Sequence, residues 1–340
     1  MPAPFSILTL DFHNTVYDEV LEYGLAIDDA IAVWLKALPH LKRETLCKEL
    51  SEAHRQLGSD WDEDAWRLMP CLKAAGDNFE TVYACAVARR REKSKELTVT
   101  TLYAGLRETL TTLKKRKVRI YVITEAAADA GVLGLDWLGL GGLVDGFYSY
   151  PSRAEPLKLK GTYQKTFPPA MQGGHLKKPH PFLIAAVALD EAQRHGRVPA
   201  DLGVEDVFRV IHEKAWLLDE LPPGSPVQRD VSTQLTLKQT PYAPALKRML
   251  DSMLYVGDSK FRDGMLARNA GVAFGFAAYG KKISEAAFHA RSLAIMYEVT
   301  GWEKEVLQLT QEAGKSRAAS ALKPDYIFQD SLAEALPLFI

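Results

Sequence analysis

The sequence is poor in cysteine, carries no excess of either charge and lacks any long apolar run. Its three cysteines, Cys47, Cys71 and Cys85, are odd in number, and their spacings match no zinc-knuckle pattern. We therefore expect free thiols in a reducing compartment, and neither a disulfide framework nor a cysteine metal site.

The charges are balanced, with 42 Lys and Arg against 43 Asp and Glu. This balance gives no overall attraction to nucleic acid or to an anionic membrane. No stretch approaches the roughly 20 apolar residues that cross a bilayer, and residues 1–5 lack the basic leader of a secretory signal. The sequence thus predicts a cytoplasmic protein with no nucleic-acid or membrane partner, and it gives no prediction of oligomeric state.

What is present is ordinary globular composition and a series of short strand-like runs. The 340 residues suffice for a core domain and an accessory domain. An apolar run over 5–10 ends in a polar turn and predicts a buried strand. Further strands are expected at 119–123, 146–150, 254–256, 272–276 and 326–328, with helix-like sequence between them. Alternating strands and helices predict a Rossmann-like α/β fold, a doubly wound parallel sheet covered on both faces.

Residues 19–91 have a different character, because their apolar residues recur at helical spacing. Three or four helices fit, with breaks near Pro39, residues 58–60 and Pro70. We expect a core domain of residues 1–17 and 105–340, and an inserted helical cap domain over 18–104. The stretches 151–174, 197–247 and 280–323 match neither domain pattern and are taken as insertions in the core.

Polar side chains stand at the predicted strand ends, where an open parallel sheet binds ligands. They are Asp11, Thr124 and Asp258, joined by Asp263 five residues beyond Asp258 and by Lys178 in a later loop. Carboxylates suit a magnesium ion and can attack as nucleophiles, while a lysine and a hydroxyl suit phosphoryl oxygens. Each alone could be a helix cap, a turn or a solvated loop residue. Their order along the chain, each at a predicted strand end or loop, favours a single site.

Four motifs resemble those of the haloacid dehalogenase-like superfamily. Residues 11–15, Asp-Phe-His-Asn-Thr, are similar to its first motif, Asp-x-Asp-x-Thr. The strand ending at Thr124 is similar to the second motif, and Lys-Pro-His-Pro at 178–181 to the third. The fourth motif, Gly-Asp-Ser with a further Asp, resembles residues 257–263, which is the most specific of the four matches.

The resemblance implies a hydrolase with a helical cap, in which Asp11 attacks the substrate and Thr124 and Lys178 bind the transferring group. It also implies a Mg²⁺ site. The ligands would be Asp11, the backbone carbonyl of His13, Asp258 and Asp263. A phosphatase acting on a small phosphorylated metabolite, through an aspartyl-phosphate on Asp11, is the leading expectation.

His13 departs from the family pattern, since the phosphatases carry a second Asp there that protonates the leaving group and then activates water. A histidine, with an ordinary pKa near 6.5, can do both, or its ring can be a spacer. Two alternatives therefore stand. One is a catalytically weak or inactive binding protein, and the other is a dehalogenase or a phosphonate hydrolase with a lysine in the cap.

Overall fold

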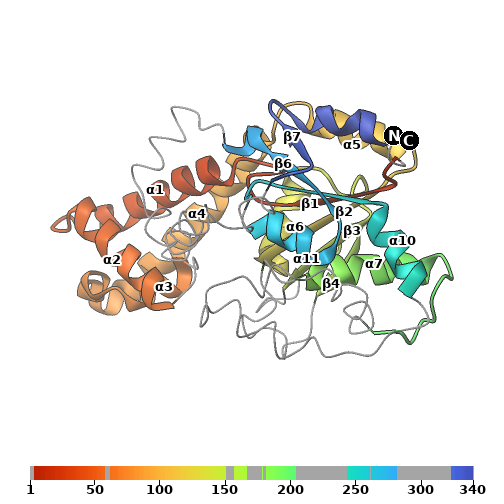
Figure 1. Ribbon diagram of the computed structural model, residues 1–340. Coiled ribbons are helices and arrows are strands. Elements are labelled where there is room, and N and C mark those ends of the chain that lie inside the picture. Colours follow the sequence, from red (N-terminus) through yellow and green to blue (C-terminus); the bar gives the residue numbers. More distant parts are fainter. Residues whose placement is uncertain are drawn as a thin grey trace, which may run out of the picture. The chain divides into compact units, whose positions relative to one another are not determined.

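The computed structural model describes residues 4–57, 62–150, 157–166, 178, 181–203, 243–260, 262–281 and 323–339 (Figure 1). The chain forms two compact units. One comprises Met1–Val16, Tyr103–Lys281 and Leu309–Ile340, and the other contains Tyr17–Leu102. Most of the three predicted insertions lies outside the described residues.

The first unit is built on a seven-stranded sheet in the order β4-β3-β2-β1-β5-β6-β7, and every pairing in it is parallel. The strands are β1 (Ile7–Asp11), β2 (Arg119–Ala127), β3 (Gly146–Tyr150), β4 (Tyr163–Thr166), β5 (Met253–Gly257), β6 (Ala273–Ala277) and β7 (Tyr326–Phe328). Among the described residues of this unit, the helices are α5 (Leu106–Lys115), α6 (Ala128–Trp137), α7 (Phe182–Arg194), α10 (Ala243–Asp251), α11 (Arg262–Ala270), η5 (Ala278–Lys281) and η6 (Leu332–Leu338).

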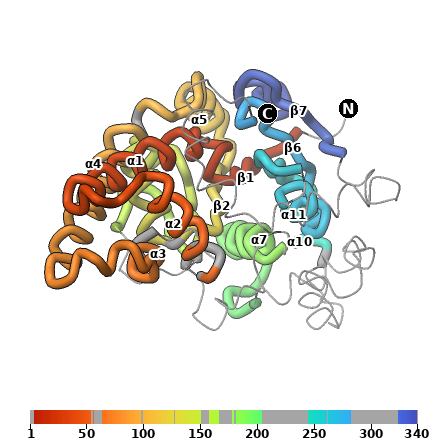
Figure 2. Tube along the Cα trace, turned by 90° about the vertical axis from the view of Figure 1, so that its left-hand side faces the viewer, coloured from red at the N-terminus to blue at the C-terminus, as the bar shows by residue number. Residues whose placement is uncertain are grey.

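Helices cover both faces of the sheet, which confirms the predicted doubly wound α/β fold. Strand residues alternate between the faces, and Ile7, Tyr121 and Tyr255 pack into one apolar cluster with α7, α10 and α11. Figures 1 and 2 show α5 on the side of the sheet opposite α7. The strands β1 and β5 are buried along their whole length, as strands inside a covered parallel sheet are expected to be.

Two strands differ from the sequence-based expectation by more than two residues. β4 lies inside the stretch 151–174, which was taken as an insertion, and it extends the sheet beyond β3. β2 continues past Thr124 to Ala127, with a shift in its pairing to β3 after Ile123. Thr124 therefore lies at the end of the regular pairing and three residues before the end of the strand.

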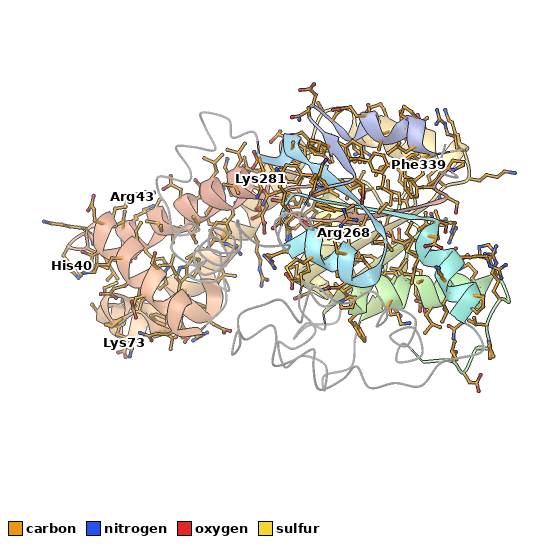
Figure 3. All side chains as sticks on the ribbon, in the orientation of Figure 1. His40, Arg43, Lys73, Arg268, Lys281 and Phe339 are labelled. Atoms are coloured by element: carbon orange, nitrogen blue, oxygen red, sulfur yellow. The ribbon has the colours of Figure 1, made fainter. Side chains whose placement is uncertain are left out.

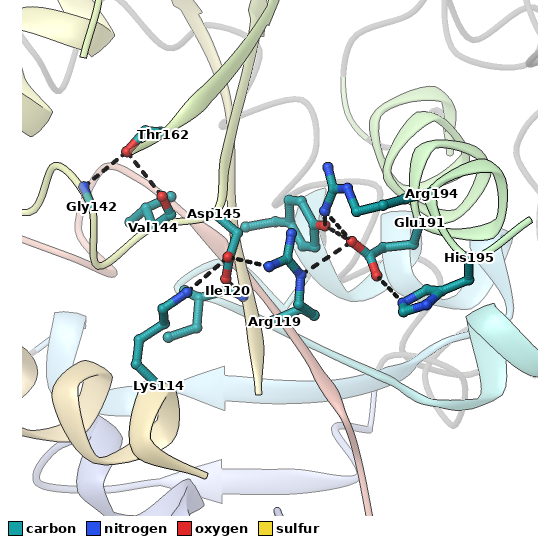
Figure 4. A network of polar contacts seen from close by, with 11 residues as sticks. Lys114, Arg119, Ile120, Gly142, Val144, Asp145, Thr162, Glu191, Arg194 and His195 are labelled. Atoms are coloured by element: carbon teal, nitrogen blue, oxygen red, sulfur yellow. Dashed lines mark hydrogen bonds and ion pairs between the residues drawn. The ribbon is translucent and has the colours of Figure 1, made fainter. Parts of the chain in front are cut away.

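A polar network anchors the amino ends of β2 and β3 (Figure 4). The Asp145 carboxylate accepts hydrogen bonds from the Ile120 N–H at 2.9 Å, from Lys114 at 2.8 Å and from Arg119 at 2.5 Å. Arg119 also lies 3.3 Å from the buried Glu191 carboxylate of α7. The network ties α7 to the amino edge of the sheet, opposite the edge where Asp11 ends β1.

The second unit is helical throughout its described residues. It contains α1 (Glu19–Ala37), α2 (Arg43–Leu57), α3 (Asp62–Leu68), η1 (Pro70–Asn78) and α4 (Phe79–Thr101). The Asp18 side chain caps α1 by accepting from the Leu21 N–H at 3.0 Å. Trp34 and Trp66 are buried edge to face with ring centroids 6.3 Å apart at the centre of its core. Within the described residues of either unit, no helix has both the length and the apolarity needed to span a membrane.

Candidate active site

Asp11 stands at the carboxyl end of β1, at the point where the strand order changes direction. β1 and β5 are neighbours, with β2 on the far side of β1 and β6 on the far side of β5. The strand that follows β1 in the chain and the strand that follows β5 therefore lie on opposite sides of this pair. Such switch points are where open α/β sheets bind ligands. Asp258 follows β5 directly, which places both carboxyl groups at this point.

The turn after β1 is held by its own backbone and by buried aromatic packing. The Val16 N–H donates to the Phe12 carbonyl at 3.0 Å, and Phe12 packs edge to face on Phe147 at 5.8 Å. Asn14 has φ of 55°, a left-handed conformation that asparagine tolerates better than most residues. These contacts fix the backbone that directly follows Asp11.

Lys178, in the third motif, contacts carboxylates of both the first and the fourth motif. Its ammonium contacts Asp11 Oδ1 and lies 2.7 Å from Asp263 Oδ1, and its side chain is 5% exposed. Burial acts against the charge on this lysine, but the two carboxylates outweigh burial and raise its pKa well above the usual range. Lys178 is therefore a permanently charged bridge between Asp11 and Asp263.

Asp263 is fixed from several sides at the start of α11. Besides Lys178, its oxygens accept from the Tyr255 hydroxyl at 2.7 Å and from the Ser259 N–H at 2.9 Å. A Cβ on Gly257 would lie 2.4 Å from the Asp263 Cγ, so only glycine lets this carboxylate pack against the end of β5. Burial tends to raise the pKa of Asp263, but Lys178 and these hydrogen bonds lower it below its usual value.

The three carboxyl groups form one acidic cluster, in which an oxygen from each of Asp11, Asp258 and Asp263 lies within 4.8 Å of the others. Burial, opposed by Lys178 and reinforced by the two other carboxylates, raises the pKa of Asp11 to about 7. Burial also raises the pKa of Asp258, against the attraction of Lys281. Burial therefore disfavours the charged form of two of the three carboxyl groups.

The surroundings of two predicted residues, Thr124 and His13, could not be inferred from their motifs. Thr124 is fully buried, and its hydroxyl accepts from the Ala126 N–H at 3.1 Å. The His13 ring is half-buried, 5.2 Å from the Phe12 ring. Burial and the charges of Lys178 and Arg262 lower the pKa of His13 to about 3, so the ring is neutral at neutral pH.

The sequence analysis missed several residues at this site. The Lys281 ammonium lies 2.7 Å from Asp258 Oδ2. Glu125 accepts from the Lys178 N–H at 2.6 Å and also pairs with Arg262. Glu125 follows Thr124 directly, and Lys281 lies four residues beyond β6, so the rule of strand ends that selected Asp11 could have found both. Lys177, Pro179 and His180 of the third motif lie outside the described residues.

The comparisons with known proteins give structural similarity only. No family model matches the chain, and no curated protein matches it. Solved structures do match. A predicted phosphoglycolate phosphatase from Haemophilus somnus 129pt is 18% identical with a TM-score of 0.43, over 98% of this chain and 97% of that one.

Two further matches are of the same kind. A 2-haloacid dehalogenase from Pseudomonas syringae pv. tomato DC3000 is 15% identical with a TM-score of 0.43, over 98% of this chain and 96% of that one. YfnB from Bacillus subtilis, described as a HAD-hydrolase bound to magnesium, is 11% identical with a TM-score of 0.42 over 99% of each chain. Similarity at this level decides nothing about chemistry, which has to be argued from the chain's own residues.

Proposed function

We propose that this chain is a hydrolase of the haloacid dehalogenase-like superfamily, which removes the phosphoryl group from a small phosphorylated metabolite with the help of Mg²⁺. The observation that carries the proposal is the Lys178 ammonium between Asp11 and Asp263, inside a cluster of three carboxyl groups. An ammonium fixed on a strand-end carboxylate serves both to orient a nucleophile and to attract a phosphoryl group.

The acidic cluster fits a hard divalent cation. Oxygen ligands at 2.0–2.6 Å from magnesium or calcium lie at most about 4–5 Å apart, and the three carboxylates meet within 4.8 Å. Since Asp263 already accepts from three protein donors, we assign direct contacts to Asp11, Asp258 and the His13 carbonyl. Asp263 would act chiefly by fixing Lys178, and it remains a candidate further ligand. The bound cation would neutralise the charge of the transferring group.

The chain's own residues then divide the reaction between them. Lys178 holds Asp11 Oδ1, which leaves the second oxygen of Asp11 to attack phosphorus as the bond to the leaving oxygen breaks. Lys178 and Thr124 would bind the phosphoryl oxygens. In the second step a water attacks the same phosphorus and frees Asp11, and the neutral His13 ring would take the proton of that water.

The helical unit would supply the cap of this hydrolase. It is inserted in the chain between the turn after β1 and helix α5, which is where the superfamily that the motifs resemble carries its helical cap. Within this unit the Asp18 N–H donates to the Thr101 carbonyl at 2.9 Å, so its two chain ends run side by side.

A second candidate is a binding protein without turnover, because position 13 carries a histidine where the resemblance implies an Asp. The low pKa of His13 leaves no imidazolium to protonate a leaving group at neutral pH. A good leaving group, such as a phenolate, needs no such proton. Turnover of aryl phosphates but not of alkyl phosphates would then point to a weak enzyme, and binding of phosphate without any turnover would point to a binding protein.

The test is a screen of phosphorylated metabolites and p-nitrophenyl phosphate, with and without Mg²⁺, on the wild type and Asp11→Asn. Loss of a nucleophile typically costs roughly 10⁴-fold or more. We expect Mg²⁺-dependent turnover that Asp11→Asn abolishes. Asp201→Asn, the same change at an exposed position, is the matched control. Turnover that survives in Asp11→Asn would contradict the proposed nucleophile.

A further inference from the structure

Lys281 reaches the acidic cluster from a segment that the four motifs do not include. It ends η5, which follows β6, and Figure 3 labels it at that end. Its ammonium lies 2.7 Å from Asp258 Oδ2, and its side chain is 48% exposed. A second lysine therefore neutralises this cluster from the solvent side, whereas Lys178 does so from the interior.

Three contacts fix the backbone that carries Lys281. The buried Tyr279 donates its hydroxyl to the Thr15 carbonyl at 2.9 Å and packs edge to face on Tyr103 at 5.1 Å. A Cβ on Gly280 would fall 1.9 Å from the Asn14 carbonyl oxygen, so the backbone of η5 is pressed against the turn after β1. The start of the Lys281 side chain is thus fixed, while the rest of it is long and half-exposed.

The two lysines differ in how readily they can leave. Lys178 is buried and bridges two carboxylates, so moving it would leave buried charges without a partner, which is costly. Lys281 pairs with Asp258 through a long side chain that is 48% exposed, so its ammonium can return to water at a lower cost than that of Lys178. Two positive charges within a few ångströms repel each other strongly in a partly buried site.

We propose that Lys281 is a resident counter-ion of Asp258 that a divalent cation displaces, so that Lys281 lowers the cation affinity of the site and swings into solvent when the cation binds. The inference rests on the cation site of the proposed function. It adds that Lys281 competes with the cation for Asp258. In the cation-free state the lysine neutralises Asp258, and the exchange makes cation occupancy depend on concentration.

The opposite role would be that Lys281 assists cation binding. Asp258 has two oxygens, and a lysine that stayed on Oδ2 could orient Oδ1 toward the cation. Removing Lys281 would then weaken cation binding. The two roles predict changes of opposite sign, so one binding measurement separates them.

The experiment is Mn²⁺ binding followed by electron paramagnetic resonance of free Mn²⁺, with Mg²⁺ as competitor and no substrate present. Coupling between two sites is typically worth roughly 5–150-fold in affinity. We expect Lys281→Met to tighten binding by roughly tenfold and Lys281→Arg to stay near wild type. Lys260→Met, which removes a charge that contacts the Phe276 ring at 4.8 Å, is the control and should change affinity little.

A second measurement reports displacement directly. Acetylation of Lys281 by an amine-reactive ester, followed by mass spectrometry, should rise several-fold when Mg²⁺ is added to the wild type. In Asp258→Asn it should be high with or without Mg²⁺.

The outcomes distinguish the inference from the function on which it rests. If the wild type binds Mn²⁺ and Lys281→Met binds equally or more weakly, the displacement proposal is wrong and the cation site stands. If neither protein binds Mn²⁺, the cation site and the proposal fail together. Binding by Lys281→Met alone would support the proposal in its strongest form.

Discussion

At the scale of single residues, the site depends on an imbalance of charge that the fold maintains. Three carboxyl groups meet two ammonium groups, and burial raises the pKa of both Asp11 and Asp258. Holding a carboxylate in such a place costs free energy, which a bound cation would offset. The same imbalance that destabilises the cation-free protein thus prepares the site for its proposed ion.

His13 is the residue that tests the proposed second step. With its pKa lowered to about 3, it is neutral at neutral pH and can accept a proton from water. We expect His13→Ala to accumulate phosphoenzyme on Asp11 and to lose roughly 10²–10⁴-fold in turnover, the usual contribution of a general base. His13→Asp should keep or raise activity. Unchanged turnover in His13→Ala would show that the ring has no part in the reaction.

Glu125 is expected to act as a positioning residue for Lys178. One of its oxygens accepts from the Lys178 N–H and the other pairs with Arg262. Glu125→Ala should raise the rate at which the buried Lys178 is acetylated several-fold and should lower kcat more than it changes KM. Glu125→Gln keeps a carbonyl acceptor, so its rate of Lys178 acetylation should lie between those of the wild type and Glu125→Ala. Equal labelling of Lys178 in all three would contradict the role.

Single residues were predictable where a strand end selects them. Asp11, Asp258 and Lys178 belong to motifs with fixed spacing, and the sheet brings them to one edge. Lys281 and Glu125 belong to no motif that the sequence matches, so only their positions near strand ends could have indicated them, and their particular contacts arise from tertiary packing.

At the scale of elements, the sequence predicted the strands with clear apolar runs and missed a weaker one. β3 and β7 have the expected bounds. β4, Tyr-Gln-Lys-Thr, has a single apolar residue, which is 48% exposed, and is held by pairing to β3 at the sheet edge. Polar edge strands carry little hydrophobic signal, and local pattern therefore could not find it.

The close approach of η5 to the turn after β1 gives a prediction about elements. Gly280→Ala would push a Cβ into the Asn14 carbonyl, so the two segments must separate. We expect a loss of about 1–3 kcal/mol in the free energy of unfolding, the usual cost of overpacking, measured by urea denaturation. Gly141→Ala, where a Cβ would meet nothing within 4 Å, is the control and should be nearly neutral. Equal stability of the two variants would contradict the close approach.

At the scale of the whole molecule, a buried ion-pair network and the acidic cluster lie at opposite edges of the sheet. The amino edge carries the buried Glu191 with Arg119, Arg194 and Tyr121 around it, and Asp145 beside them (Figure 4). The carboxyl edge carries the acidic cluster. We therefore expect a substitution at one edge of the sheet to leave the other edge unchanged.

Glu191→Ala should destabilise the fold and leave the site intact. It removes a carboxylate that is 1% exposed and leaves Tyr121 and Arg119 without this partner. Loss of a buried partner costs about 3–5 kcal/mol, and since Arg119 is partly exposed we expect about 2 kcal/mol. Glu108→Ala in α5 is the exposed control. Thermal unfolding and Mn²⁺ affinity measured together would test this, and a large change in affinity would contradict the separation.

Mg²⁺ should stabilise the protein in a pH-dependent manner. The folded-state pKa of Asp11, about 7, is above its ordinary value, so the folded protein holds a proton that the unfolded chain has lost between those values. Stability without the cation therefore falls as pH rises through this window. Because the cation competes with that proton, we expect Mg²⁺ to raise Tm more at pH 8 than at pH 6. Asp258→Asn should show no such shift, and an equal shift at both pH values would contradict the account.

The central claim, that Asp11 is the nucleophile, is tested most directly by trapping the covalent intermediate. The protein is mixed with p-nitrophenyl phosphate, or with a metabolite found in the screen, in the presence of Mg²⁺. It is then quenched in acid and reduced with borohydride, which converts an aspartyl phosphate to homoserine. The account predicts homoserine at position 11 alone, in larger amount in His13→Ala. Phosphate release with no homoserine at position 11, or with modification at another carboxylate, would contradict it.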